Sequence, residues 1–131
     1  MTDTDIKDIS PTELEVLKVL WQSSPLNAND IVQQLNQKDQ WHEKTVKTLL
    51  NRLVNKGAVG FDKDGRAYNY YPLLSQQSFQ SRESQSFIKR VFGGKLAPLV
   101  AGFAGSSKLT QDDVAELKQL IDAWEKEQGH D

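Results

Sequence analysis

Residues 43–72 read EKTVKTLLNRLVNKGAVGFDKDGRAYNYYP. The first half of this segment places apolar side chains three and four residues apart, which is the spacing of one helix face. They are Val46, Leu49, Leu50, Leu53 and Val54. Gly57 then ends the helix, because glycine readily takes the left-handed conformation found after a helix. The second half alternates with period two on either side of Asp64-Gly65, a hairpin turn signal. The segment therefore predicts a helix over 43–56 followed by a β-hairpin.

Two more helices are expected before this segment. Ser10-Pro11-Thr12-Glu13 combines a capping box with a proline in the first turn, which starts a helix. Asn27 is a second capping residue, and apolar residues follow it at helical spacing. The order helix, helix, helix, hairpin is that of a winged helix-turn-helix. The predicted fold class is therefore mainly α with a small β-hairpin wing, followed by a further helical region.

The length of 131 residues allows one domain or two small ones. We assign residues 9–73 to a winged-helix DNA-binding domain and residues 74–128 to a C-terminal helical region. Three short helices make a poor core on their own. Their apolar stripes therefore fold back on the winged helix or pair with a second chain, and we favour the symmetric dimer. The candidate interface residues are Phe87, Val91, Leu117, Leu120, Ile121 and Trp124.

The composition excludes several classes of site. There is no cysteine, which excludes disulfides, thiolate metal sites and cysteine nucleophiles, and the two histidines, His42 and His130, lie far apart. The sequence contains no glycine-rich phosphate loop and no nucleophile–base pair, so we expect no enzyme, no cofactor and no metal site. The N-terminus lacks a secretory signal and no apolar run could cross a membrane, so we expect a cytoplasmic protein without membrane insertion.

The net charge of −2 hides a basic segment. Residues 41–66 carry six basic and three acidic side chains, whereas residues 1–40 carry three basic and seven acidic ones. The basic side chains lie on the outer face of the predicted helix and at the hairpin tip, where Lys63 and Arg66 flank the turn. For contact with DNA, local charge matters more than the total. Because a winged helix inserts its third helix into the major groove and rests its wing on phosphates, the pattern predicts double-stranded DNA as a partner.

The same segment carries a family resemblance. The run KTVKTLLNRL over residues 44–53, followed by GRAY over 65–68, resembles the penicillinase-repressor family, and the likeness extends from Ile9 to about Trp124. The resemblance implies a homodimeric repressor in which each winged helix binds one half of a palindromic operator. Copper-responsive members of the family carry a cysteine pair, and this chain has no cysteine, so that metal-sensing mode is excluded.

The resemblance also implies roles for individual residues. The positions at which the family reads bases correspond to Lys44, Thr45 and Thr48. Positions that contact phosphates or support the third helix are Lys47, Asn51, Arg52, Lys63 and Arg66. Many relatives have Ser-Pro at the cap of this helix, whereas this chain has His42-Glu43. We therefore expect a weaker cap and an acidic side chain close to the first phosphates.

The best-known members of the family repress β-lactam-resistance genes. A membrane sensor protease detects the drug, and the repressor is then cut before a phenylalanine near the last helical region. The corresponding residues here are Gly102 and Phe103, with Gly102 where those members have asparagine. The alternative function is a winged-helix module that binds a protein instead of specific DNA, since winged helices also bind proteins and the net charge is negative.

Overall fold

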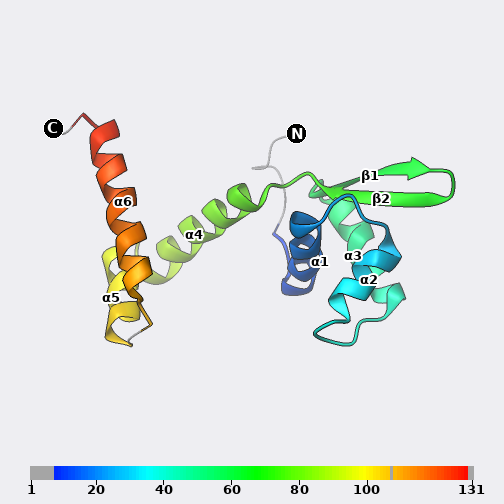
Figure 1. The fold of residues 1–131 in the computed structure, drawn as a ribbon, viewed down its shortest axis with the longest axis horizontal. Coiled ribbons are helices and arrows are strands. Elements are labelled where there is room, and N and C mark those ends of the chain that lie inside the picture. The colour runs from blue at the N-terminus through cyan, green and yellow to red at the C-terminus, as the bar shows by residue number, and fades with distance from the viewer. Residues whose placement is uncertain (1–7, 107, 130–131) are drawn as a thin grey trace. The chain divides into compact units, whose positions relative to one another are not determined.

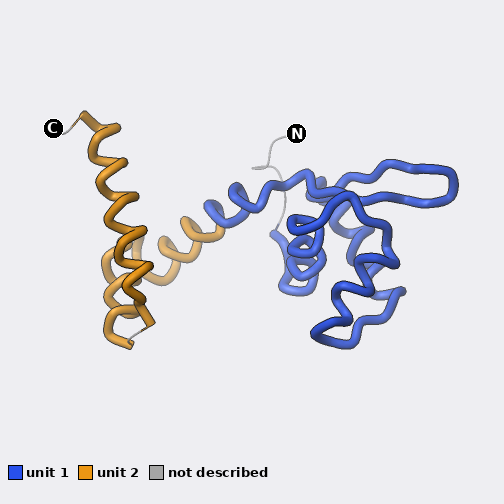
Figure 2. The backbone as a smooth tube through the Cα atoms, in the orientation of Figure 1, with its two compact units in different colours: residues 1–82 blue, residues 83–131 orange. Residues whose placement is uncertain are grey.

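The computed structural model describes residues 8–106 and 108–129 (Figure 1). The elements, in chain order, are α1 (Pro11–Gln22), α2 (Ala28–Leu35), α3 (Glu43–Asn55), β1 (Val59–Asp64), β2 (Ala67–Pro72), α4 (Gln76–Phe92), α5 (Ala97–Gly105) and α6 (Gln111–Glu127). This order confirms the predicted fold class. The chain divides into two compact units, residues 1–82 and residues 83–131, and the boundary between them lies within α4 (Figure 2).

The first unit is built around one apolar core, to which α1, α2, α3 and the hairpin all contribute. Its fully buried members include Val16, Leu17, Leu20, Ile31, Val46, Leu50, Leu53 and Val59. Each fully buried side chain of this kind contributes about 2 kcal/mol to folding. The predicted inner stripe of α3 is confirmed, and packing of that stripe leaves the opposite face of α3 on the surface.

The start of α4 belongs to the same core. Phe79 is buried against Trp21, with 5.7 Å between their ring centroids. The indole N–H of Trp21 donates a hydrogen bond to the carbonyl oxygen of Leu74 over 2.8 Å. These contacts fix the chain directly after the hairpin, so the first turns of α4 are part of the winged-helix unit.

The side-chain caps predicted for α1 and α2 are present. Ser10 and Glu13 form the capping box of α1, and Asn27 caps α2 by accepting a hydrogen bond from the backbone N–H of Asp30 over 2.9 Å. Thr110 and Asp113 form a second capping box on α6. His42 occupies the N-cap of α3 without a side-chain hydrogen bond, which confirms the weaker cap expected there.

The hairpin is attached to the helices by a backbone pairing that the sequence did not predict. The N–H of Leu26 donates to the carbonyl of Tyr70 over 3.0 Å, and the N–H of Tyr70 donates back over 2.8 Å. Leu26 immediately precedes the cap of α2. The wing and the start of α2 are therefore fixed relative to each other by two hydrogen bonds.

The second unit differs from the first because α5 and α6 contain no buried residue among those described. Several of its large apolar side chains are exposed, namely Phe87, Val91, Leu96, Phe103, Leu120, Ile121 and Trp124. An apolar groove of about 380 Å³ runs between α5 and α6, with Leu99, Leu117 and Leu120 among its lining residues. In the described parts of the chain, no helix combines the length and apolar character that crossing a bilayer requires.

Candidate nucleic-acid interface

The outer face of α3 carries the residues expected to read bases. Lys44, Thr45 and Thr48 are all exposed and line a hollow of about 650 Å³. This feature, the α3 hollow, is completed by four other residues: Thr12, His42, Leu49 and Arg52. The structure therefore brings together all three base-reading candidates and one supporting candidate. Asn51 is exposed on the same helix but lines neither this hollow nor the cavity described below.

Thr48 has a defined hydrogen-bonding state. Its hydroxyl donates to the carbonyl oxygen of Lys44 over 3.0 Å, one helical turn earlier. With its proton engaged, the oxygen keeps its lone pairs and acts as an acceptor. In a major groove an acceptor at this position suits the amino group of adenine or cytosine, whereas the Lys44 ammonium is a donor and suits guanine.

The wing faces a second opening, about 520 Å³ in volume, which we name the wing cavity. It is lined by Asn27, Ala28, Asn29, Lys47, Lys63, Arg66, Ala67, Tyr68 and Tyr70. Three of the predicted phosphate-contacting residues thus converge from α3 and both sides of the hairpin turn. Gly65, with φ of +63°, lies in that turn, between Lys63 on β1 and Arg66, which directly precedes β2.

The side chains around the wing cavity influence one another. The Nζ atom of Lys63 lies 5.7 Å from the centroid of the Tyr68 ring, within range of a cation–π attraction. Burial raises the pKa of the Tyr70 hydroxyl, Tyr68 raises it further, and the positive charge of Lys47 partly offsets both. Lys47 also pairs with Glu43 at 3.1 Å, one turn earlier on α3.

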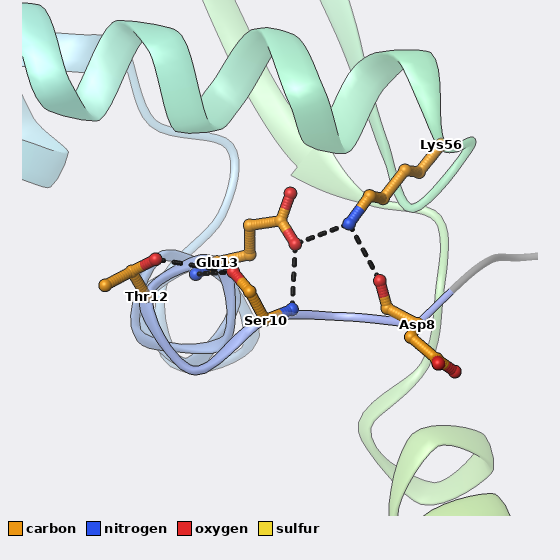
Figure 3. Close-up of polar contacts among 5 residues, drawn as sticks. All are labelled: Asp8, Ser10, Thr12, Glu13 and Lys56. Carbon is orange, nitrogen blue, oxygen red and sulfur yellow. Dashed lines mark hydrogen bonds and ion pairs between the residues drawn. The ribbon is translucent and has the colours of Figure 1, made fainter.

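A buried ion pair positions the far end of α3. Glu13 Oε1 accepts a hydrogen bond from the Lys56 ammonium over 2.6 Å, and the backbone N–H of Ser10 donates to the same oxygen over 2.8 Å (Figure 3). The Lys56 ammonium also donates to the carbonyl of Asp8 over 2.7 Å. One carboxylate therefore both caps α1 and fixes the C-terminal end of α3 against it.

Burial determines the electrostatics of this pair. The side chain of Glu13 is 1% exposed and that of Lys56 is 24% exposed. Burial raises the pKa of the Glu13 carboxyl, but the hydrogen bonds from Lys56 and Ser10, together with the charge of Lys56, outweigh it and hold the pKa below the ordinary value. Glu13 is therefore ionised at neutral pH, and its charge is compensated inside the fold.

Several residues that line these two openings were not predicted as site residues. Thr12 lines the α3 hollow, while Asn27, Asn29 and Tyr68 line the wing cavity. Asn27 carries a sequence signal, but as a helix cap only. Thr12 and Asn29 have no local signal, because their place at an opening depends on the packing of α1 against α3 and of the wing against α2.

Comparison with known proteins agrees with this geometry. The family model described as penicillinase repressor matches residues 9–123. A penicillinase repressor of Bacillus licheniformis is 35% identical over 117 residues, covering 89% of this chain and 91% of the relative. The methicillin resistance regulatory protein MecI of Staphylococcus aureus (strain N315) is 31% identical over 119 residues, covering 91% and 97%.

A solved structure matches the first unit. The solution structure of the DNA binding domain of the repressor BlaI superposes with a TM-score of 0.51 at 40% sequence identity. It covers 56% of this chain and 89% of that domain. The family model spans most of the chain, and the similar relatives are matched over nearly their whole length. The chain therefore belongs to the penicillinase repressor family and is a DNA-binding repressor.

Proposed function

We propose that the protein is a homodimeric, sequence-specific transcriptional repressor that binds a palindromic operator through α3 and the wing. In this proposal the winged-helix domain, residues 9–73, binds DNA, and the dimer interface lies within residues 74–128. The observation that carries it is the lining of the two openings. The described residues around them include five basic side chains besides His42, namely Lys44, Lys47, Arg52, Lys63 and Arg66, and no carboxylate.

The two openings support different tasks. Lys44, Thr45 and Thr48 present short and long polar groups on one helix face, which suits contact with base edges. Lys47, Lys63 and Arg66 present positive charge around the wing cavity, which suits phosphates. Arg52 and Asn51, further along α3, support the helix on the backbone. Base contacts supply sequence preference, whereas phosphate contacts supply most of the affinity and its dependence on salt.

This division predicts opposite effects of two alanine substitutions. Thr45→Ala is expected to relax sequence preference, with discrimination at one base pair falling by about tenfold and only a small change in overall affinity. Lys63→Ala is expected to weaken binding to all sequences alike and to reduce the salt slope by about one. Selection from a random duplex library, followed by affinity measurement at several salt concentrations, checks both. The reverse pattern would show that the roles are wrongly assigned.

The exposed apolar residues of the second unit support the dimer. Leu120 is 67% exposed, Trp124 58% and Ile121 57%, and all three lie on α6. Large apolar side chains grouped in this way are typical of a surface that is covered by a partner. Phe87 and Val91 on α4 are exposed as well, while Leu117 is half-buried in the groove between α5 and α6. A second copy of the chain presents the same surface, so a symmetric dimer covers both.

Relief of repression by proteolysis is part of the proposal. Gly102 and Phe103 lie within α5, where Phe103 is 50% exposed and Gly102 weakens the helix. A cut before Phe103 separates α6 from the winged helix and so removes most of the candidate interface. Because the relatives are named as penicillinase and methicillin-resistance regulators, we propose β-lactam-resistance genes as targets and a membrane sensor protease as the upstream partner. The site of action is then the cytoplasm.

Mass spectrometry of the protein from the cells that produce it checks the proteolytic step. After exposure to a β-lactam, a fragment ending at Gly102 is expected to accumulate, and it is expected to be absent from untreated cells. An intact chain in treated cells that have already induced resistance would contradict this part of the proposal.

A further inference from the structure

The wing cavity is organised before any ligand binds. The Leu26–Tyr70 backbone pairing fixes the wing to the residue before the N-cap of α2, with N···O distances of 3.0 and 2.8 Å. Tyr70 is buried, and Tyr68 lies beside it with 6.4 Å between ring centroids. Rigid walls therefore carry the polar groups on two sides of the opening, and a ligand entering it meets groups that need little reordering.

The polar groups around the wing cavity suit an oxyanion. Lys47, Lys63 and Arg66 come from α3, β1 and the turn before β2, and none of the described lining residues is acidic. Asn27 accepts from the N–H of Asp30, whereas the first two N–H groups of a helix have no acceptor within it. The amides of Ala28 and Asn29 are thus left for an acceptor outside α2, next to the three cations.

One carboxylate competes for one of these three cations, Lys47. Glu43 pairs with Lys47 at 3.1 Å, and both side chains are more than half exposed. In the described parts of the chain, neither Lys63 nor Arg66 pairs with a carboxylate. A phosphate that enters the cavity therefore meets two unpaired cations and one that must exchange Glu43 for the phosphate. An exposed pair of this kind is weak enough to be exchanged.

We propose that the wing cavity holds a single DNA backbone phosphate, bound jointly by Lys47, Lys63 and Arg66, and that Glu43 competes with this phosphate for Lys47. The inference rests on the proposed operator binding and deepens it. It couples α3 to the wing, because both contact the same phosphate. If α3 and the wing contacted different phosphates, their contributions to affinity would be independent. It also makes Glu43 a negative determinant of operator affinity.

Neutralising single phosphates tests the shared contact. The full chain is titrated with duplexes that carry one methylphosphonate at successive backbone positions of its operator. At one position in each half-site, wild-type affinity is expected to fall about tenfold. In the Lys47→Met protein, a methylphosphonate at the same position is expected to lower affinity by about twofold or less. The Lys63→Met and Arg66→Met proteins are expected to behave in the same way. Lys18→Met, which removes an exposed cation of α1 away from the cavity, is the matched control and keeps the full penalty.

A second pair of variants tests the competition. Glu43→Gln is expected to tighten operator binding about threefold and to make its salt dependence steeper. Glu15→Gln removes the same charge from another exposed pair, Glu15–Lys18 at 3.2 Å, and is expected to have a much smaller effect. Equal tightening by both variants would attribute the effect to net charge and overturn the competition.

The outcomes separate this inference from the operator proposal. One outcome is that the wild type binds its operator while each of the three cation variants loses the methylphosphonate penalty at a different backbone position. That result would leave the repressor proposal standing and would overturn the shared phosphate. Titration with inorganic phosphate tests whether the cavity binds a free anion instead of a DNA phosphate. Amide shifts at Ala28 and Asn29 in phosphate solution, without any coupling in the methylphosphonate series, would assign the cavity to a free anion and overturn the DNA assignment.

Discussion

Leu120→Glu is expected to convert the protein to a monomer and to weaken binding to the full operator by about 100-fold or more. Leu120 is 67% exposed on α6 and contributes to the groove between α5 and α6. A charge there has to be buried without a partner when two chains associate, which is costly. In the dimer, binding of one winged helix holds the other near the second half-site at high effective concentration. Once the chains separate, this increase in operator affinity is lost.

Light scattering and operator titration with the same samples check this expectation. Gln119→Glu adds the same charge to the neighbouring exposed position and is the matched control, expected to remain dimeric. Binding to an isolated half-operator is expected to be unchanged in Leu120→Glu, because the α3 surface is untouched. A dimeric Leu120→Glu protein would show that the interface lies elsewhere.

Lys56→Met is expected to lower the free energy of unfolding of the first unit by about 3 kcal/mol. The substitution leaves the Glu13 carboxylate, 1% exposed, without its positive partner. The other oxygen of Glu13, Oε2, is buried with no donor among the described residues, so no alternative contact compensates. Urea denaturation at fixed protein concentration, followed by tryptophan fluorescence, measures the change. Lys56→Arg keeps the positive charge and is the control. Its free energy of unfolding is expected to fall much less.

The pH dependence of that loss identifies its cause. The pKa of Glu13 is held below its ordinary value of 4.5, so the stability that its charge contributes is present above that pH and is lost as pH falls through the pKa in the folded protein. The difference in unfolding free energy between the wild type and Lys56→Met is therefore expected to be largest near neutral pH and to shrink in acid. A difference that stays constant down to acidic pH would show that lost packing of the lysine chain, and not lost charge, explains the effect.

Local signals in the sequence predicted most of the first unit. The spacing of Val46, Leu49 and Leu53 predicted the buried face of α3, and Asp64-Gly65 predicted the hairpin turn. These signals are readable because they depend on neighbours a few residues away. The same spacing also predicted which α3 residues are exposed, and so which side chains are available to DNA.

Contacts between distant segments could not be predicted in this way. Glu13 and Lys56 are 43 residues apart, and the sequence marked Glu13 only as part of a capping box. The pairing of Leu26 with Tyr70 is an isolated bridge between two single residues, so it leaves no periodic pattern in the sequence. The wing cavity depends on that pairing, so Asn29 carried no signal although it lines the cavity.

Binding of the full-length protein to the DNA upstream of its own gene tests the central claim most directly. Fluorescence anisotropy compares that duplex with a scrambled one at two salt concentrations. The account predicts tight binding to the native duplex, much weaker binding to the scrambled duplex, two chains per site, and a steep loss of affinity with salt. Equal, weak binding to both duplexes would contradict it, and would favour a winged-helix module that binds another protein.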